Sequence, residues 1–232
     1  MSNSDQSIKS VSNTAFIFPG QGSQKVGMGR DLIDFPVSAN VFKRVDDALG
    51  RKLSDIIFNG PDDELMLTRN AQPAIMTVSI ACYEALKEKS GDLFPVPQYV
   101  AGHSLGEYTS LYVSGVLDLE ETAKLVSLRG ELMQDACDQN PGTTAALIGL
   151  DEKAVYEISR QTGTYVSNIN TDLQTVISGD KAAIISAIDL ATSRGAKRAI
   201  PLKVAGAFHS DLMSPAADKL ENYINDLKFS NP

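Results

Sequence analysis

The stretch Gln98-Tyr-Val-Ala-Gly-His-Ser-Leu-Gly-Glu-Tyr108 decides the fold expected for this chain, because it joins a short apolar strand directly to a helical stretch. At the junction, Gly102-His103-Ser104-Leu105-Gly106, a glycine stands two residues to either side of a serine. Small neighbours are needed where the backbones of a sharp strand-to-helix turn pass close together. Such a turn presents a hydroxyl at the sheet edge, beside a helix N-terminus. The pattern predicts an α/β fold with Ser104 as nucleophile; the alternative is a tight turn with an incidental serine.

A serine of ordinary pKa needs a general base within hydrogen-bond reach, and the sequence has only 2 histidines. His103 is adjacent to Ser104, but neighbours on such a turn point to different sides, so we expect it to support the pocket or the core. His209 follows an expected strand and precedes an expected helix, in Val204-Ala-Gly-Ala-Phe-His-Ser210. His209 is therefore the candidate base, and a solvated loop histidine is the alternative.

Two further features suit acyl chemistry. Gly20-Gln21-Gly22 follows an apolar strand at 14–18, so its backbone N–H groups can complete an oxyanion hole; a glycine-rich surface turn is the alternative. Arg129 lies on a helix expected over 120–137. In a partly dry pocket its guanidinium would bind a carboxylate through two charge-assisted hydrogen bonds, but spacing alone favours an exposed arginine.

The remaining pattern predicts a large α/β domain interrupted by a small one. Helices are expected over 71–88, 107–113, 120–137 and 211–227. Between 144 and 202 the order strand–helix–strand–strand–helix–strand is that of a ferredoxin-like unit, with Asp151 and Asp180 as helix N-caps. We expect this insertion at 138–205, with 1–137 and 206–232 forming the large domain.

Composition limits the partners. The 232 residues include 21 Lys and Arg against 29 Asp and Glu, a net charge of −8, which argues against nucleic acid. No window approaches the roughly 18 apolar residues of a membrane span. The 2 cysteines, Cys82 on an apolar helical stripe and Cys137, lack a CxxC context and are expected to be free thiols. Residues 1–14 are polar, without a secretory signal, and predict a mobile tail. We expect a cytoplasmic monomer without a membrane or nucleic-acid partner.

Four motifs together resemble the malonyl-CoA:acyl-carrier-protein transacylases of fatty-acid synthesis and the related acyltransferase domains of polyketide synthases. The motifs are FPGQGSQ at 18–24, GHSLGEY at 102–108, Leu128-Arg-Gly130 with Met133, and GAFHS at 206–210. They occur in family order, and the resemblance covers residues from about 14 to 232. It implies an α/β-hydrolase-like large domain with an inserted ferredoxin-like domain.

The resemblance also implies a ping-pong reaction. Ser104 would carry the malonyl group between coenzyme A and the phosphopantetheine thiol of acyl carrier protein, with His209 as base. Gln21 and Leu105 would hold the oxyanion through their backbone N–H groups. The family's reaction needs no metal or redox cofactor.

Substrate contacts follow from the same resemblance. Arg129 would pair with the malonyl carboxylate, and Phe208 matches the malonyl-selecting form of its motif. Gln72 and Asn170 match polar positions near the family's pocket. Because carrier proteins of this family are acidic, a basic docking surface is expected at Arg194, Lys197, Arg198 and Lys203.

The family pattern continues beyond 228–232 with a further strand and a C-terminal part of the large domain, which helps to orient the histidine. We therefore expect a truncated form or partial sequence, with a shortened natural relative as the alternative. An absent strand would leave an exposed sheet edge and apolar face, which predicts self-association. The rival functions are a serine hydrolase or thioesterase and a non-catalytic carrier-protein-binding relative.

Overall fold

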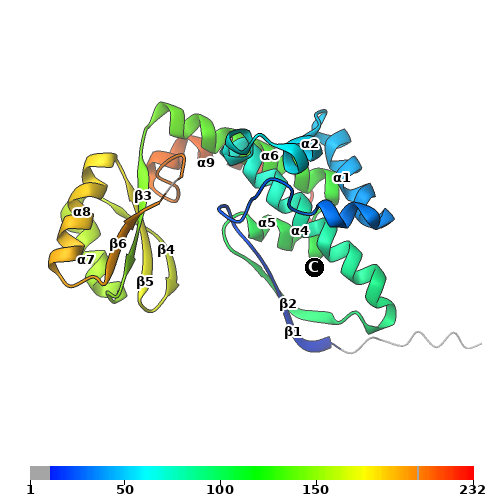
Figure 1. Cartoon of the computed structure of the whole chain (residues 1–232), viewed down its shortest axis with the longest axis horizontal. Coiled ribbons are helices and arrows are strands. Elements are labelled where there is room, and N and C mark those ends of the chain that lie inside the picture. Colours follow the sequence, from blue (N-terminus) through cyan, green and yellow to red (C-terminus); the bar gives the residue numbers. More distant parts are fainter. Residues whose placement is uncertain (1–10, 203) are drawn as a thin grey trace, which may run out of the picture. The chain divides into compact units, whose positions relative to one another are not determined.

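The computed structural model describes residues 11–202 and 204–232, and the chain divides into two compact units (Figure 1). The first unit holds Met1–Met66, Asn70–Ser127 and Lys228–Pro232. The second holds Leu67–Arg69 and Leu128–Leu227. Within the described ranges, no helix is long and apolar enough to cross a membrane.

The first unit is built on two parallel strands, β1 (Val11–Phe18) and β2 (Val96–Gly102), which are both among the predicted strands. Their register pairs Phe18 with Gly102, so both strands end at the same edge of the sheet. The glycine turn that follows β1 and the serine turn that follows β2 therefore begin side by side (Figure 1).

Helices cover this short sheet. The predicted helices are confirmed as α4 (Thr68–Ser90), α5 (Gly106–Val113) and α6 (Leu119–Gln139). The segment between β1 and α4, for which we predicted no element, forms η1 (Arg30–Asp34), α1 (Pro36–Leu49), α2 (Leu53–Asn59) and α3 (Asp62–Met66). Their apolar side chains join those of α4 and α6 in one core, which includes Val45, Leu53, Ile57, Met76 and Ile80. A short turn, η2 (Gly91–Leu93), leads from α4 to β2.

Two expectations for the first unit need correction. The tail expected over 1–14 is wrong from Val11 onwards, because β1 begins there; residues 1–10 lie outside the described part of the chain. Cys82 was expected on a core-facing stripe, but it is exposed, as is Leu86 one turn later. These two side chains border an apolar cavity of about 420 Å³ between α4 and β1. Ile17 of β1 also lines it and is 77% exposed.

The second unit contains the predicted ferredoxin-like arrangement. Its elements are β3 (Thr143–Ile148), α7 (Glu152–Thr162), β4 (Tyr165–Thr171), β5 (Gln174–Gly179), α8 (Lys181–Ser193) and β6 (Arg198–Pro201). The sheet order is β4-β5-β3-β6 with every neighbouring pair antiparallel, and α7 and α8 cover one face (Figure 1). Both predicted N-caps are confirmed, because Asp151 and Asp180 each accept a hydrogen bond of 2.8 Å from the N–H three residues later.

The chain then returns to α6. The helix expected from 211 begins as a 3₁₀ turn, η3 (Asp211–Met213), and α9 spans only Ser214–Asn225, with a proline in its first turn. Met213 and Ala216 pack against the second half of α6, at Met133, Ala136 and Cys137. This packing places the second half of α6 in the same compact unit as the ferredoxin-like sheet.

Candidate active site

The serine turn has a left-handed backbone at its centre. Ser104, between β2 and α5, has φ of 51°, and His209 has φ of 56°. Among the residues that the structure describes, these are the two non-glycine residues with positive φ. Such a conformation costs about 1–3 kcal/mol and persists only where the surrounding structure enforces it. Backbone strain therefore coincides with the two residues that the sequence analysis selected as nucleophile and base.

The glycines flanking Ser104 are required by close backbone contact. A β-carbon on Gly102 would overlap the backbone of Gly106 and Glu107, and one on Gly106 would overlap the carbonyl group of Phe18. The predicted steric reason for the Gly-x-Ser-x-Gly spacing is confirmed. The crowding arises because α5 starts directly against the ends of β1 and β2.

Backbone hydrogen bonds fix the serine turn. The N–H of His103 donates to the Phe18 carbonyl at 3.0 Å, and the N–H of Glu107 donates to the Ser104 carbonyl at 3.1 Å. Ser104 is half-buried, whereas the Leu105 side chain is fully buried in the core. Leu105 thereby anchors the start of α5, and its position at the N-cap places its backbone N–H at the positive end of that helix.

The glycine turn after β1 packs on the serine turn. A β-carbon on Gly20 would lie 2.5 Å from the carbonyl oxygen of His103 and 2.6 Å from its Nδ1. Gln21 follows at once and is half-buried, and its Oε1 lies 3.4 Å from Nε2 of Gln72. Gln72 comes from α4 and is fully buried. The first unit thus gathers Gln21, Gln72, Ser104 and Leu105 at one edge of the sheet.

The second unit gathers Arg129 and His209. Both line a cavity of about 150 Å³ whose other lining residues are apolar: Leu132, Met133, Met213, Ala216, Ala217 and Leu220. Arg129 is 9% exposed, so the exposed arginine that spacing alone favoured is wrong. A guanidinium among apolar side chains binds a carboxylate strongly, because little water competes for the charge.

The other predicted residues of the second unit lie elsewhere. Phe208 is half-buried and packs on the apolar cluster of α6 and α9, and Asn170 is exposed on β4. Of the apolar residues in the cavity, the sequence had pointed to two: Met133 in the Leu-Arg-Gly motif, and Leu220 on the buried face of the helix expected over 211–227. Leu132 follows Arg129 by three residues on α6, and Met213, Ala216, Ala217 and Leu220 recur at helical spacing, so periodicity was an available signal.

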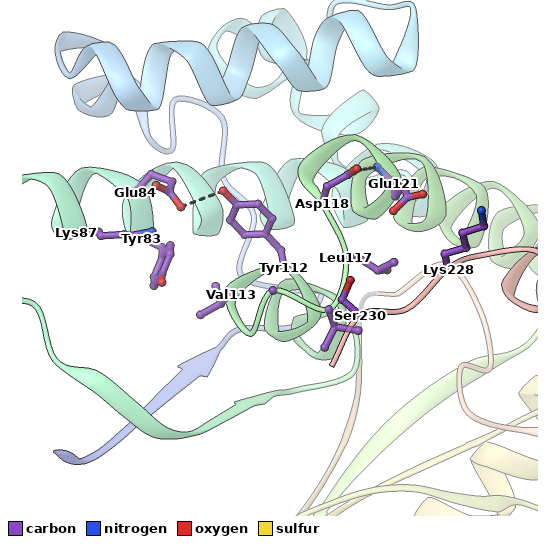
Figure 2. A pocket seen from close by; sticks show the side chains of 12 residues that line it. Tyr83, Glu84, Lys87, Tyr112, Val113, Leu117, Asp118, Glu121, Lys228 and Ser230 are labelled. Atoms are coloured by element: carbon purple, nitrogen blue, oxygen red, sulfur yellow. Dashed lines mark hydrogen bonds between the residues drawn. The ribbon is translucent and has the colours of Figure 1, made fainter. Parts of the chain in front are cut away.

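A second cavity in the first unit, of about 430 Å³, holds none of the predicted site residues (Figure 2). Tyr112 there donates a hydrogen bond of 2.9 Å to Glu84, and burial together with that carboxylate raises the pKa of Tyr112. Lys87 lies over the ring of Tyr83, and Asp118 caps the first turn of α6 by accepting from the N–H of Glu121 (Figure 2). Three of the charged residues that line this cavity, Glu84, Lys87 and Asp118, thus have neighbouring groups as partners.

No group of three or more His, Cys, Asp or Glu side chains is placed to hold a metal ion within the described ranges. Both cysteines are free thiols, as predicted.

Comparison with known proteins gives one consistent result. The family model described as acyl transferase domain matches residues 15–232. A malonyl CoA-acyl carrier protein transacylase of Bacillus subtilis is 43% identical over 221 residues, which are 93% of this chain and 68% of that protein. The Escherichia coli K12 protein of the same name is 40% identical, with 94% and 71% covered.

Solved structures agree. An acyl-carrier-protein-S-malonyltransferase from Bartonella henselae aligns with a TM-score of 0.89 at 46% identity, covering 95% of this chain and 72% of that one. A type II PKS acyl-carrier protein in complex with its malonyl-transacylase aligns with a TM-score of 0.89 at 41% identity, with the same coverage of 95% and 72%.

Proposed function

Because the chain belongs to the acyl transferase domain family, we propose that it transfers a malonyl group from coenzyme A to the phosphopantetheine thiol of acyl carrier protein, in fatty-acid synthesis. The observation that carries this proposal is the apolar cavity that two side chains line together, Arg129, which is 9% exposed, and His209, which is exposed to solvent. A carboxylate-binding cation beside a proton acceptor suits a thioester substrate whose acyl group ends in a carboxylate.

The proposed reaction has two half-reactions. Ser104 Oγ attacks the thioester carbonyl of malonyl-CoA while His209 takes its proton, and the backbone N–H groups of Gln21 and Leu105 receive the developing oxyanion. The carbon–sulfur bond then breaks, and His209 gives its proton to the departing coenzyme A sulfur. The carrier thiol then attacks malonyl-Ser104 with His209 as base, the bond between the acyl carbon and Oγ breaks, and His209 returns the proton to Ser104. No atom changes its oxidation state, and the backbone N–H groups receive the oxyanion, so the proposed steps use neither a redox cofactor nor a metal.

Arg129 supplies specificity rather than chemistry. It binds the malonyl carboxylate in both half-reactions, and that interaction fixes the thioester carbonyl relative to the nucleophile. Gln72 supports this arrangement through Gln21, the residue that it contacts. Phe208 narrows the space for a methyl branch, and Asn170 contributes a polar contact near the substrate.

We also propose that the ferredoxin-like insertion spans 138–205 and that 1–137 and 206–232 form the large domain. The proposed location is the cytoplasm, since free thiols persist in a reducing compartment.

The decisive experiment follows the acyl group by intact mass. Malonyl-CoA should add one malonyl group to the protein, the adduct should be absent in Ser104→Ala, and holo carrier protein should remove it. Ser193→Ala, which changes an exposed serine of α8, is the matched control and should acylate normally. Rapid loss of the adduct to water would instead identify a hydrolase, and no adduct in the parent protein would identify a non-catalytic binding protein.

We further propose that acyl carrier protein docks on basic side chains near β6. Lys197 and Arg198 are exposed at the start of this strand; Arg194 donates to Gln161 at 2.9 Å, and Lys203 lies outside the described residues. The double variant Lys197→Glu/Arg198→Glu should raise the KM for carrier protein and leave acylation by malonyl-CoA unchanged. An equal effect on both half-reactions would contradict this docking surface.

A further inference from the structure

The loop that carries His209 connects β6 to η3, and its backbone is strained at the histidine itself, where φ is 56°. A left-handed histidine returns to negative φ unless neighbouring groups prevent it. The φ of His209 changes when the peptide group between Phe208 and His209 rotates, so whatever holds the Phe208 carbonyl also holds the histidine.

The first half of the loop is held by close packing. A β-carbon on Gly206 would overlap Sγ of Cys137 on α6, and one on Gly142 would lie 2.6 Å from Cβ of Ala207. Gly206 and Ala207 are both buried. These contacts fix where the loop starts, but they leave the orientation of the Phe208 carbonyl open.

That carbonyl is held by a buried hydroxyl. Ser178, on β5, has no exposed surface (0%), and its Oγ donates to the Phe208 carbonyl at 2.6 Å. Ser167, on β4, donates in turn to Oγ of Ser178. A serine hydroxyl has one proton, so when Ser178 accepts from Ser167 its own proton is directed to Phe208.

We propose that Ser178 is a positioning residue for His209: it fixes the Phe208–His209 peptide group, and Ser167 orients the Ser178 hydroxyl. The inference rests on the proposed function insofar as His209 is the base. Ser178 touches no reacting atom and acts through the backbone, so it sets the direction of the imidazole rather than its chemistry. The ferredoxin-like sheet, through β4 and β5, thereby determines the geometry of a catalytic side chain.

The residues that follow His209 make further contacts that hold the loop. Ser210 donates to the Ala207 carbonyl at 2.6 Å, which closes the loop on itself. The charge of Asp211, and a hydrogen bond to it, raise the pKa of Tyr165 on β4, so this strand also contacts the start of η3, directly after the loop.

The test compares Ser178→Ala and Ser167→Ala with Ser159→Ala. Ser159 lies on α7 of the same unit and is 4% exposed, and within the described part of the chain its hydroxyl has no hydrogen-bond partner. It therefore controls for the removal of a buried hydroxyl as such.

The first readout is amide hydrogen exchange followed by mass spectrometry, which needs no activity. In Ser178→Ala the peptide covering 204–212 should exchange about fivefold faster, the change that one net hydrogen bond corresponds to, while peptides of α7 stay unchanged. Ser167→Ala should show a smaller increase at the same peptide, and Ser159→Ala none. A purely structural role would instead raise exchange across the whole second unit, and that result would overturn the proposal.

The second readout is the rate of malonyl-Ser104 formation. Ser178→Ala should lower the maximal rate about 10- to 100-fold with the KM for malonyl-CoA unchanged, because misplacement of a catalytic group by about 1 Å has an effect of this size. The double variant with Ser167→Ala should be no slower than Ser178→Ala alone, since both act through one hydrogen bond.

His209→Ala distinguishes a failure of the proposed function from a failure of the positioning role of Ser178. If His209→Ala acylates at the parent rate, the proposed base is wrong, and hydrogen exchange alone decides whether Ser178 holds the loop. If His209→Ala is inactive while Ser178→Ala matches the parent in exchange and rate, the positioning role is refuted and the proposed function stands. Should Ser178→Ala fail to fold, Ser167→Ala decides, and parent-like loop exchange in that variant would overturn the proposal.

Discussion

Removal of the Arg129 side chain should convert a malonyl-selective site into an unselective one. Arg129 is 9% exposed and shares its cavity with apolar side chains and His209, so a bound malonyl carboxylate in Arg129→Ala would be buried without a partner. Truncation of one partner of a buried charge pair costs about 2–5 kcal/mol. At about 1.4 kcal/mol per factor of ten, a middle value of about 3 kcal/mol lowers kcat/KM for malonyl-CoA on the order of 100-fold. Because the acetyl group has no carboxylate, kcat/KM for acetyl-CoA should change little in Arg129→Ala.

The assay is single-turnover acylation by each thioester, quenched and measured by intact mass, so that acyl transfer to carrier protein does not contribute. Arg129→Met keeps the volume of the alkyl stem and separates lost charge from lost packing. Arg160→Ala, on the exposed face of α7, is the matched control and should behave as the parent for both thioesters. Equal losses for malonyl and acetyl transfer in Arg129→Ala would refute the carboxylate clamp.

Three further predictions concern the described contacts. Gly106→Ala should lower the melting temperature by several degrees and abolish acylation, because its β-carbon would overlap the Phe18 carbonyl; a parent-like melting curve would contradict the crowding. At pH 8 iodoacetamide should label the exposed Cys82 and spare the buried Cys137, because burial raises the pKa of the Cys137 thiol to about 11. Labelling of Cys137 should become fast only near or above pH 11. Equal labelling rates of the two cysteines at pH 8 would disprove the burial of Cys137. Ile17→Lys should reduce self-association in sedimentation velocity, since Ile17 is 77% exposed beside an apolar cavity; unchanged association would show that another surface is responsible.

The parts of the fold that sequence predicts well are those governed by local rules. Three predicted features follow from residues close together in the chain: the glycines around Ser104, the two aspartate N-caps, and the succession of strands and helices along the ferredoxin-like unit. The helices α1–α3 carried weaker signals, yet Pro36 at the first position of α1 and Gly50 after its end, with φ of 63°, were available markers.

The burial of Arg129 is a different case, because no local pattern encodes it. Its cavity is closed by residues 209–220, some 80 positions later, and Gly130 beside it allows α6 to approach the start of α4. A β-carbon on Gly130 would lie 2.8 Å from the Thr68 carbonyl oxygen. Helical spacing gives the face of a residue relative to its own helix and says nothing of what later covers that face.

The hydrogen-bonded chain from Ser167 through Ser178 to the Phe208 carbonyl limits how domains can be exchanged between members of this family. A ferredoxin-like insertion is an attractive unit for exchange between relatives, since it is contiguous and has its own core. Here, however, β5 directly and β4 through it hold the backbone of the loop that carries His209, the proposed base. A chimera that exchanges the insertion without the matching loop would therefore inherit a turnover defect even where its substrate pocket is intact. Successful grafts should be those that transfer β4, β5 and the histidine loop as one block.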